Sequence, residues 1–162
     1  RRADRQRGDG RQIVGHWRVL TQPVTDSRGP AAKGVTQATI DSIMQQSRAH
    51  NPAQGITGVL CYGGDVYMQV LEGGRGPVNA LYNRIVTDAR HEQVMLLHYE
   101  EVAERRFAGW TMGHVNLANV NPSTLLKYLE KPELDPFAVS GRASMALLEE
   151  LIAAAQIVCR AG

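Results

Sequence analysis

Residues 47–74 have the sequence SRAHNPAQGITGVLCYGGDVYMQVLEGG, and this stretch contains the pattern that decides the fold. Two short runs of β-forming residues, 55–62 and 65–72, are joined by Gly63 and Gly64. A pair of glycines permits the positive φ angles of a tight hairpin turn. The stretch therefore predicts two neighbouring antiparallel strands.

The residues before this hairpin predict a helix. Thr36 is a plausible N-cap, and the helix is expected to run to about residue 50. Pro52 disfavours helical geometry at Asn51, so the helix is expected to stop there. The predicted buried face is Ile40, Ile43 and Met44, and helical spacing extends that face to Ser47 and Asn51. Two polar residues thus continue an apolar stripe.

A further polar residue is out of place in the strand that follows the glycine pair. Alternation puts Tyr67, Gln69 and Leu71 on one face of that strand. Gln69 is therefore expected among apolar neighbours, where an amide without a partner costs a few kcal/mol. Asn51 could simply cap the helix, and Gln69 could simply bond to backbone. Alternatively, the two amides jointly clamp a flat heterocycle that has both donors and acceptors.

The remaining elements complete a recognisable order. Residues 12–21 predict a first strand, and residues 93–101 and 107–117 predict two more. Between them, Pro77 suits the first turn of a second helix, whose apolar stripe is Val78, Leu81 and Ile85. The fold class is α+β, and the order β-α-β-β-α-β-β predicts a ferredoxin-like sandwich with an added strand and a C-terminal helical extension.

The two ends of the chain differ in character from its centre. We expect residues 1–11, with five arginines, to form a flexible basic arm, and residues 12–118 to form the sandwich. Residues 119–162 form the C-terminal extension, with a short helix started by Asn121 and then an amphipathic one. The apolar side of that last helix either packs on the back of the sheet or binds another chain. Its members are Met145, Leu148, Leu151, Ile152 and Ala155.

Composition excludes several classes of function. The chain has 162 residues and a formal net charge of +2, which gives no electrostatic case for nucleic-acid binding. No apolar run approaches the length of a membrane span. Two cysteines do not make a disulfide framework, so a reducing cytoplasm is expected. The five histidines lack metal-ligand spacing, no catalytic motif is present, and we expect neither a metal site nor an enzyme.

Several blocks of the sequence together resemble one known family. They are SRAHN (47–51), GITGVLCY (55–62), QVLEGG (69–74), DARH (88–91) and RRFAGWTMG (105–113). These blocks, in this order and at this spacing, resemble the BLUF domains, which are flavin-binding blue-light sensors. The residues that follow resemble the C-terminal extension of short, stand-alone BLUF proteins.

The resemblance implies a cofactor and a set of contacts. The cofactor would be FAD, with Asn51 and Gln69 at the edge of the flavin ring. The resemblance also places Ser47, His50, Arg90 and His91 along the ring. Gln69 would rearrange on illumination, and Trp110 and Met112 would relay the change. By resemblance, output would pass to a protein partner or through a homo-oligomer.

One feature of the family is absent. BLUF photochemistry uses a first-strand tyrosine, whereas the first tyrosine in this chain is Tyr62, and alignment puts Leu20 near the missing position. We therefore expect a flavin-binding signalling module without normal photoactivity. The alternative is a degenerate BLUF scaffold that binds no flavin and serves as a structural or interaction subunit of a larger assembly.

Overall fold

The computed structural model describes residues 14–23, 36–63, 66–88, 91–135 and 138–153, with the backbone alone for 14–23, 91–93 and 152. Five strands form one sheet in the order β4-β1-β3-β2-β5. They are β1 (Val14–Pro23), β2 (Thr57–Gly63), β3 (Val66–Gly74), β4 (His91–Val102) and β5 (Gly113–Asn116). The β-α-β-β-α-β-β order and the α+β class are confirmed.

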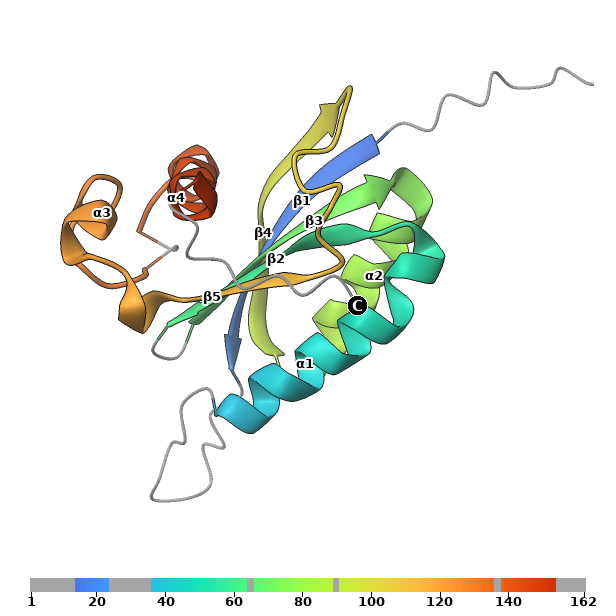
Figure 1. The fold of residues 1–162 in the computed structure, drawn as a ribbon, viewed down its shortest axis with the longest axis horizontal. Coiled ribbons are helices and arrows are strands. Elements are labelled where there is room, and N and C mark those ends of the chain that lie inside the picture. Colours follow the sequence, from blue (N-terminus) through green and yellow to red (C-terminus); the bar gives the residue numbers. More distant parts are fainter. Residues whose placement is uncertain (1–13, 24–35, 64–65, 89–90, 136–137, 154–162) are drawn as a thin grey trace, which may run out of the picture.

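The strand pairing matches a ferredoxin-like sandwich. β3 pairs with β1 and with β2 in antiparallel fashion, β4 pairs with β1 in the same way, and β5 runs parallel to β2. The helices α1 (Gln37–His50) and α2 (Arg75–Thr87) cover one face of the sheet (Figure 1). The helices α3 (Pro122–Leu126) and α4 (Gly141–Ala153) lie on the other side.

Alternation along β3 divides the core in two, as the sequence predicts. Tyr67 and Leu71 are buried with residues of α1 and α2, whereas Met68 and Val70 are buried with residues of α3 and α4. A side chain on β3 therefore faces one helix pair or the other. Gln69 has the parity of Tyr67 and Leu71, which turns it toward α1 and α2.

The first helix begins and ends largely as the sequence predicts. The Thr36 side chain caps it by accepting a hydrogen bond from the backbone N–H of Thr39 at 3.2 Å. The helix ends at His50, as predicted, although Asn51 keeps helical angles of φ −63° and ψ −39°, which a following proline disfavours. A 3₁₀ turn, Pro52–Gln54, follows directly, and Gly55 then ends it with φ 65°. Glycine tolerates this left-handed conformation without strain.

The fifth strand is shorter than predicted. It covers Gly113–Asn116 instead of residues 107–117. The preceding residues, 103–112, form the β4–β5 loop, in which the N–H of Trp110 donates to the carbonyl of Phe107 at 2.9 Å. The aromatic and apolar residues of this segment favour a strand, but their backbone groups bond within turns and to the carboxylate of Glu72.

The C-terminal extension packs on the back of the sheet. Asn121 caps α3 by accepting from the N–H of Ser123 at 2.9 Å, as predicted. Met145, Leu148 and Leu151 of α4 are buried with Val59 and Val70 of the sheet. For these residues the packing interpretation of the apolar stripe is the one that the structure supports. The Ile152 side chain and Ala155 lie outside the described residues.

Candidate functional site

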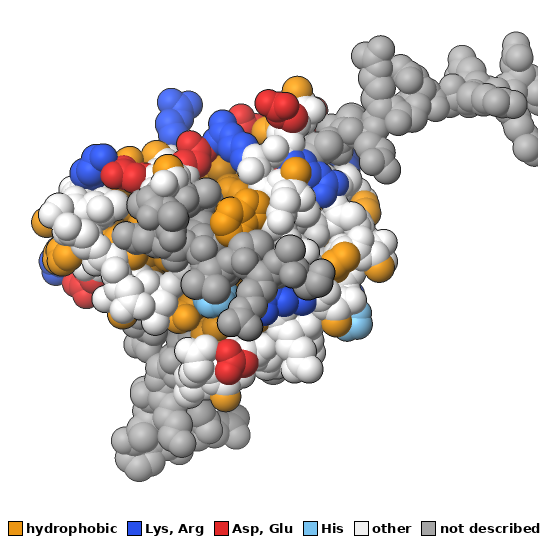
Figure 2. Space-filling view, in the orientation of Figure 1, with side chains coloured by type: hydrophobic (Ala, Val, Ile, Leu, Met, Phe, Trp, Pro, Cys, Tyr) orange, Lys and Arg blue, Asp and Glu red, His pale blue; other side chains and the backbone are white. Residues whose placement is uncertain are grey.

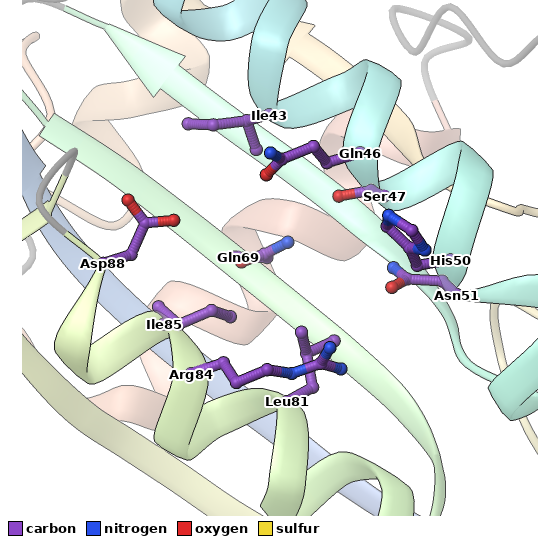
Figure 3. Close-up of a pocket in the computed structure, with 10 residues that line it drawn as sticks. All are labelled: Ile43, Gln46, Ser47, His50, Asn51, Gln69, Leu81, Arg84, Ile85 and Asp88. Atoms are coloured by element: carbon purple, nitrogen blue, oxygen red, sulfur yellow. The ribbon is translucent and has the colours of Figure 1, made fainter.

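A cavity of about 180 Å³ opens between α1, α2 and β3 (Figure 3). One wall comes from α1, the facing wall comes from α2, and the strand lies between them. The lining residues are Ile43, Gln46, Ser47, His50, Asn51, Gln69, Leu81, Arg84, Ile85 and Asp88. The cavity therefore combines apolar walls with amide, hydroxyl, imidazole and charged groups.

Asn51 brings a buried amide to the cavity. The residue is 3% exposed, and its backbone is fully used, because its N–H donates to Ser47 and its carbonyl accepts from Gln54 and Ile56. The side chain makes no capping bond. Its amide nitrogen has no hydrogen-bond partner among the described residues. Asn51 thus occupies the C-cap position of α1, as one interpretation predicts, but it does so through its backbone, and its buried side-chain donor is left for something in the cavity.

Gln69 brings a second buried amide from the strand. It is 4% exposed, and its Nε2 donates to the Sδ of Met112 at 3.8 Å. A thioether is a weak acceptor, so this bond satisfies the amide poorly. Met112 is fully buried in the core cluster under α1 and α2. The strand thus presents a polar group that is free to exchange a weak partner for a stronger one.

The predicted residues of the first helix meet these amides in space. Ser47 and His50 line the same cavity as Asn51 and Gln69. In Figure 3 the side chains of Ser47 and His50 come from α1 beside Asn51, above the strand that carries Gln69. Four of the six predicted cofactor-binding residues are therefore brought together.

The other two predicted contacts have a different status. Arg90 lies outside the described residues. His91 begins β4, and its side chain lies outside the described residues as well. The wall that faces α1 combines Leu81 and Ile85 of the predicted stripe with two residues that the sequence does not single out, Arg84 of α2 and Asp88 at its C-cap. Helical spacing from the predicted stripe residues Leu81 and Ile85 could have indicated both.

The two predicted relay residues are separated by the sheet. Met112 contacts Gln69 on the face covered by α1 and α2. Trp110 is partly buried and packs against the cluster on the opposite face, with the residues of α3 and α4. In this structure the thioether, and not the indole, is the neighbour of the glutamine.

The first strand contains no tyrosine at any position, because β1 has the sequence VGHWRVLTQP. Its register pairs the backbone of Val19 with Gln69 and that of Leu20 with Met68. The residue whose backbone pairs with Gln69 is thus Val19, the neighbour of Leu20, and neither of them has a phenol. The absence of the family's tyrosine does not depend on the exact alignment.

The donor set suits a flat heterocycle. An amide offers two N–H donors and an acceptor oxygen, and two such groups lie at one cavity whose walls include Ile43, Leu81 and Ile85. A ring system with an edge of alternating carbonyl and N–H groups would satisfy both amides while its faces contact the apolar walls. The unpartnered nitrogen of Asn51 is the observation that makes this fit specific.

Metal-ligating clusters and membrane-spanning helices are both absent from the described part of the chain. No set of three or more histidine, cysteine, aspartate or glutamate side chains there is placed to hold a metal ion. None of the described helices combines the length and apolar character that crossing a membrane requires.

Comparison with known proteins gives a consistent result. A sequence model for "BLUF: Sensors of blue-light using FAD" matches residues 25–113, more than half of the chain. The photoactivated adenylate cyclase subunit beta of Euglena longa is 31% identical over 83 residues, which are 51% of this chain and 10% of that protein. The subunit alpha of Euglena gracilis is 35% identical over 75 residues, 46% of this chain and 7% of that one. The chain thus spans only a small part of these relatives.

Solved structures with the same fold cover nearly all of the chain. BlrB, a BLUF protein in its dark state, has a TM-score of 0.68 at 27% identity, covering 89% of this chain and 98% of that one. BlrP1 of Klebsiella pneumoniae has a TM-score of 0.60 at 26% identity, covering 87% of this chain and 35% of that one. BlsA in its photo-activated state has a TM-score of 0.74 at 24% identity, covering 86% and 95%, and shows the fold alone. The family match, the sequence relatives and the fold agree, and the chain belongs to the BLUF family, the sensors of blue light using FAD.

Proposed function

We propose that this chain is a flavin-binding sensory module and that FAD occupies the cavity between α1 and α2. The observation that carries the proposal is the buried amide nitrogen of Asn51, which has no partner among the described residues although it lines the cavity. A donor that is buried without a partner costs about 1–3 kcal/mol, and a ligand acceptor would remove that cost. The BLUF family is described as using FAD, and one of the BlrP1 structures contains FMN.

In this proposal each described residue has a defined task. Asn51 and Gln69 would bind the polar edge of the flavin, and Ser47 and His50 would line it from α1. The flavin itself would supply the absorption of blue light. Gln69 is the group able to change its hydrogen bonds, since its present acceptor is the weak one, Met112 Sδ at 3.8 Å. Arg90 and His91 are proposed as further contacts on sequence grounds alone.

The light response is a separate part of the proposal. Because β1 has no tyrosine, the chain lacks the family's usual donor of an electron and a proton beside Gln69. We propose that flavin binding is retained and that the usual red shift of the flavin band is absent or abnormal. Trp17 is the aromatic residue of that strand, but an indole has only an N–H donor and cannot accept a hydrogen bond from Gln69 as a phenol can.

The output is proposed to be a protein contact and not a reaction. The relatives named as adenylate cyclases are far longer than the matched segment, which is 10% of subunit beta. We propose that this chain signals through a partner or through a second copy of itself, and that it acts in a reducing cytoplasm. The buried, unpaired thiol of Cys61 supports the reducing compartment.

A second candidate is a BLUF scaffold without flavin that serves as a structural or interaction subunit. The size of the cavity favours this candidate, because 180 Å³ is below the range of about 300–1,000 Å³ usual for ligand pockets. Under this hypothesis the unpartnered amide of Asn51 is a remnant of a lost site, and the absent tyrosine reflects the same loss.

One experiment separates the two candidates. The purified chain is titrated with FAD, with free flavin removed by gel filtration, and the bound flavin is measured by absorbance. The first candidate predicts saturable binding of one FAD per chain, which is weakened by Asn51→Ala. A colourless protein that takes up no FAD supports the scaffold and refutes the sensory module. Blue-light illumination of the loaded protein then tests the light response, for which no normal red shift is expected.

A further inference from the structure

A buried carboxylate lies outside the cavity and has no part in the proposed flavin contacts. Glu72 of β3 is 0% exposed. Its Oε2 accepts a hydrogen bond from the backbone N–H of Phe107 at 2.8 Å, and its Oε1 accepts one from the backbone N–H of Arg106 at 3.2 Å. A buried charge is costly unless it is paired and hydrogen-bonded. Two backbone N–H groups of the β4–β5 loop therefore help to offset the cost of burying this carboxylate.

The same loop carries the residue that touches Gln69. Six positions after Arg106, Met112 places its Sδ 3.8 Å from Gln69 Nε2. Between these points the carbonyl of Trp110 accepts from the N–H of Gly58 at 3.1 Å. Gln69 and Glu72 are three residues apart on β3, which is about 10 Å along a strand. One strand therefore contacts the loop at two places, through the amide on one face and through the carboxylate on the other.

The loop also reaches the C-terminal helix. The guanidinium of Arg106 forms an ion pair with Glu149 of α4. Phe107, which is 2% exposed, is buried in the cluster that contains Leu147 and Leu148 of α4. Acidic and basic side chains lie beside one another at the upper left in Figure 2, the region in which Figure 1 shows α4. The residues that Glu72 holds are thus the ones that contact α4.

We propose that Glu72 is a positioning residue that fixes the β4–β5 loop, and so holds Met112 on the amide of Gln69 and Arg106 beside Glu149. The proposed role as a link between cavity and α4 rests on the proposed flavin site, whereas the positioning itself does not require flavin. A carboxylate bonded to two successive backbone N–H groups fixes that peptide more firmly than one neutral bond would. Loss of the charge should therefore let the loop shift at both ends.

The test uses Glu72→Gln, which keeps the shape of the side chain and one acceptor oxygen but removes the charge and the second acceptor. The readouts are the methyl signal of Met112 and the side-chain amide signals of Gln69, recorded by NMR on the flavin-free full chain. They are assigned with Met112→Leu and Gln69→Leu. The proposal expects all of these signals in Glu72→Gln to move by more than their line widths.

A matched control separates positioning from a general loss of stability. Leu125 of α3 is buried in the same back cluster, and its hydrocarbon side chain cannot hydrogen-bond to the β4–β5 loop. Leu125→Ala should destabilise the chain and leave the Met112 and Gln69 signals in place. If Glu72→Gln lowers stability while these signals stay where they are in the wild type, the proposal is overturned and Glu72 is merely structural.

A second variant and a separate measurement of FAD uptake complete the test. If Glu72→Gln does not fold, Glu72→Asp keeps the charge but shortens the side chain by one methylene, and the same signals should move. Unmoved signals in a folded Glu72→Asp chain would then overturn the proposal. FAD uptake is measured separately and decides only the proposed flavin site, because the positioning readouts come from the flavin-free protein.

Discussion

The side chain of Asn51 should stabilise the complex with flavin and destabilise the flavin-free protein. Asn51→Ala removes a buried amide nitrogen that has no partner among the described residues, whereas the three backbone hydrogen bonds of this residue remain. Relief of an unsatisfied buried donor is worth about 1–3 kcal/mol, and part of it is offset by the small void that the change creates. We expect the free energy of unfolding of the flavin-free chain to rise by about 1 kcal/mol.

The same substitution should weaken flavin binding. One or two neutral hydrogen bonds contribute about 1–3 kcal/mol in total, and about 1.4 kcal/mol corresponds to a tenfold change in affinity. FAD affinity should therefore fall by about tenfold to a hundredfold. Urea unfolding followed by circular dichroism measures the stability, and quenching of flavin fluorescence measures the affinity.

Gln45→Ala is the matched control for this pair of measurements. Gln45 is an exposed amide on the same helix, so its removal should change the free energy of unfolding by less than about 0.5 kcal/mol and leave FAD affinity unchanged. The reasoning is refuted if Asn51→Ala destabilises the flavin-free chain and leaves FAD affinity as it is. That result would make the amide an ordinary structural group.

Three further predictions concern the fold and its titrating groups. A Cβ at Gly58 would lie 2.0 Å from the Val70 carbonyl oxygen, so Gly58→Ala should lower the free energy of unfolding, measured in urea, by at least about 3 kcal/mol. Gly76 has open space around it, so Gly76→Ala should leave the free energy of unfolding unchanged or raise it by up to about 1 kcal/mol. Burial lowers the pKa of His114 below its ordinary 6.5, so the native chain holds this proton less tightly than the unfolded chain does. The free energy of unfolding should therefore fall as pH decreases from 6.5, and His114→Phe should flatten that part of the profile; equal slopes in both proteins would contradict this. Burial raises the pKa of the Cys61 thiol, so a thiol reagent should leave Cys61 unmodified in the native chain and modify it in urea, as measured by mass spectrometry. Rapid modification of Cys61 in the native chain would contradict this prediction and show that the strand opens.

The sequence predicts the parts of the fold in which local chemistry and tertiary packing agree. In β3 the alternation of Tyr67, Gln69 and Leu71 matches the burial found, and the spacing in α1 brings Ser47 and Asn51 to the cavity. The resemblance to BLUF domains, carried by blocks around these residues, is confirmed by the family match over residues 25–113.

Other features could not be predicted because they depend on contacts distant in the sequence. Phe107 and Trp110 have the composition of a strand, but the carboxylate of Glu72, 35 residues from Phe107, holds this part of the chain as a loop. A single glutamate in an apolar run gives no signal of such a contact. Helical angles at Asn51 were also missed, since the 3₁₀ turn that follows outweighs the local effect of Pro52.

The central claim is that Asn51 and Gln69 bind one flavin from two sides of the same cavity. Its most direct test is the set of side-chain amide signals of these two residues in a ¹H–¹⁵N spectrum, recorded before and after one equivalent of FAD is added. The signals are assigned with Asn51→Ala and Gln69→Leu, and the exposed Gln45 serves as the internal reference. We predict that both amides shift on FAD binding while Gln45 does not. Bound FAD with both amide signals unchanged would contradict the account.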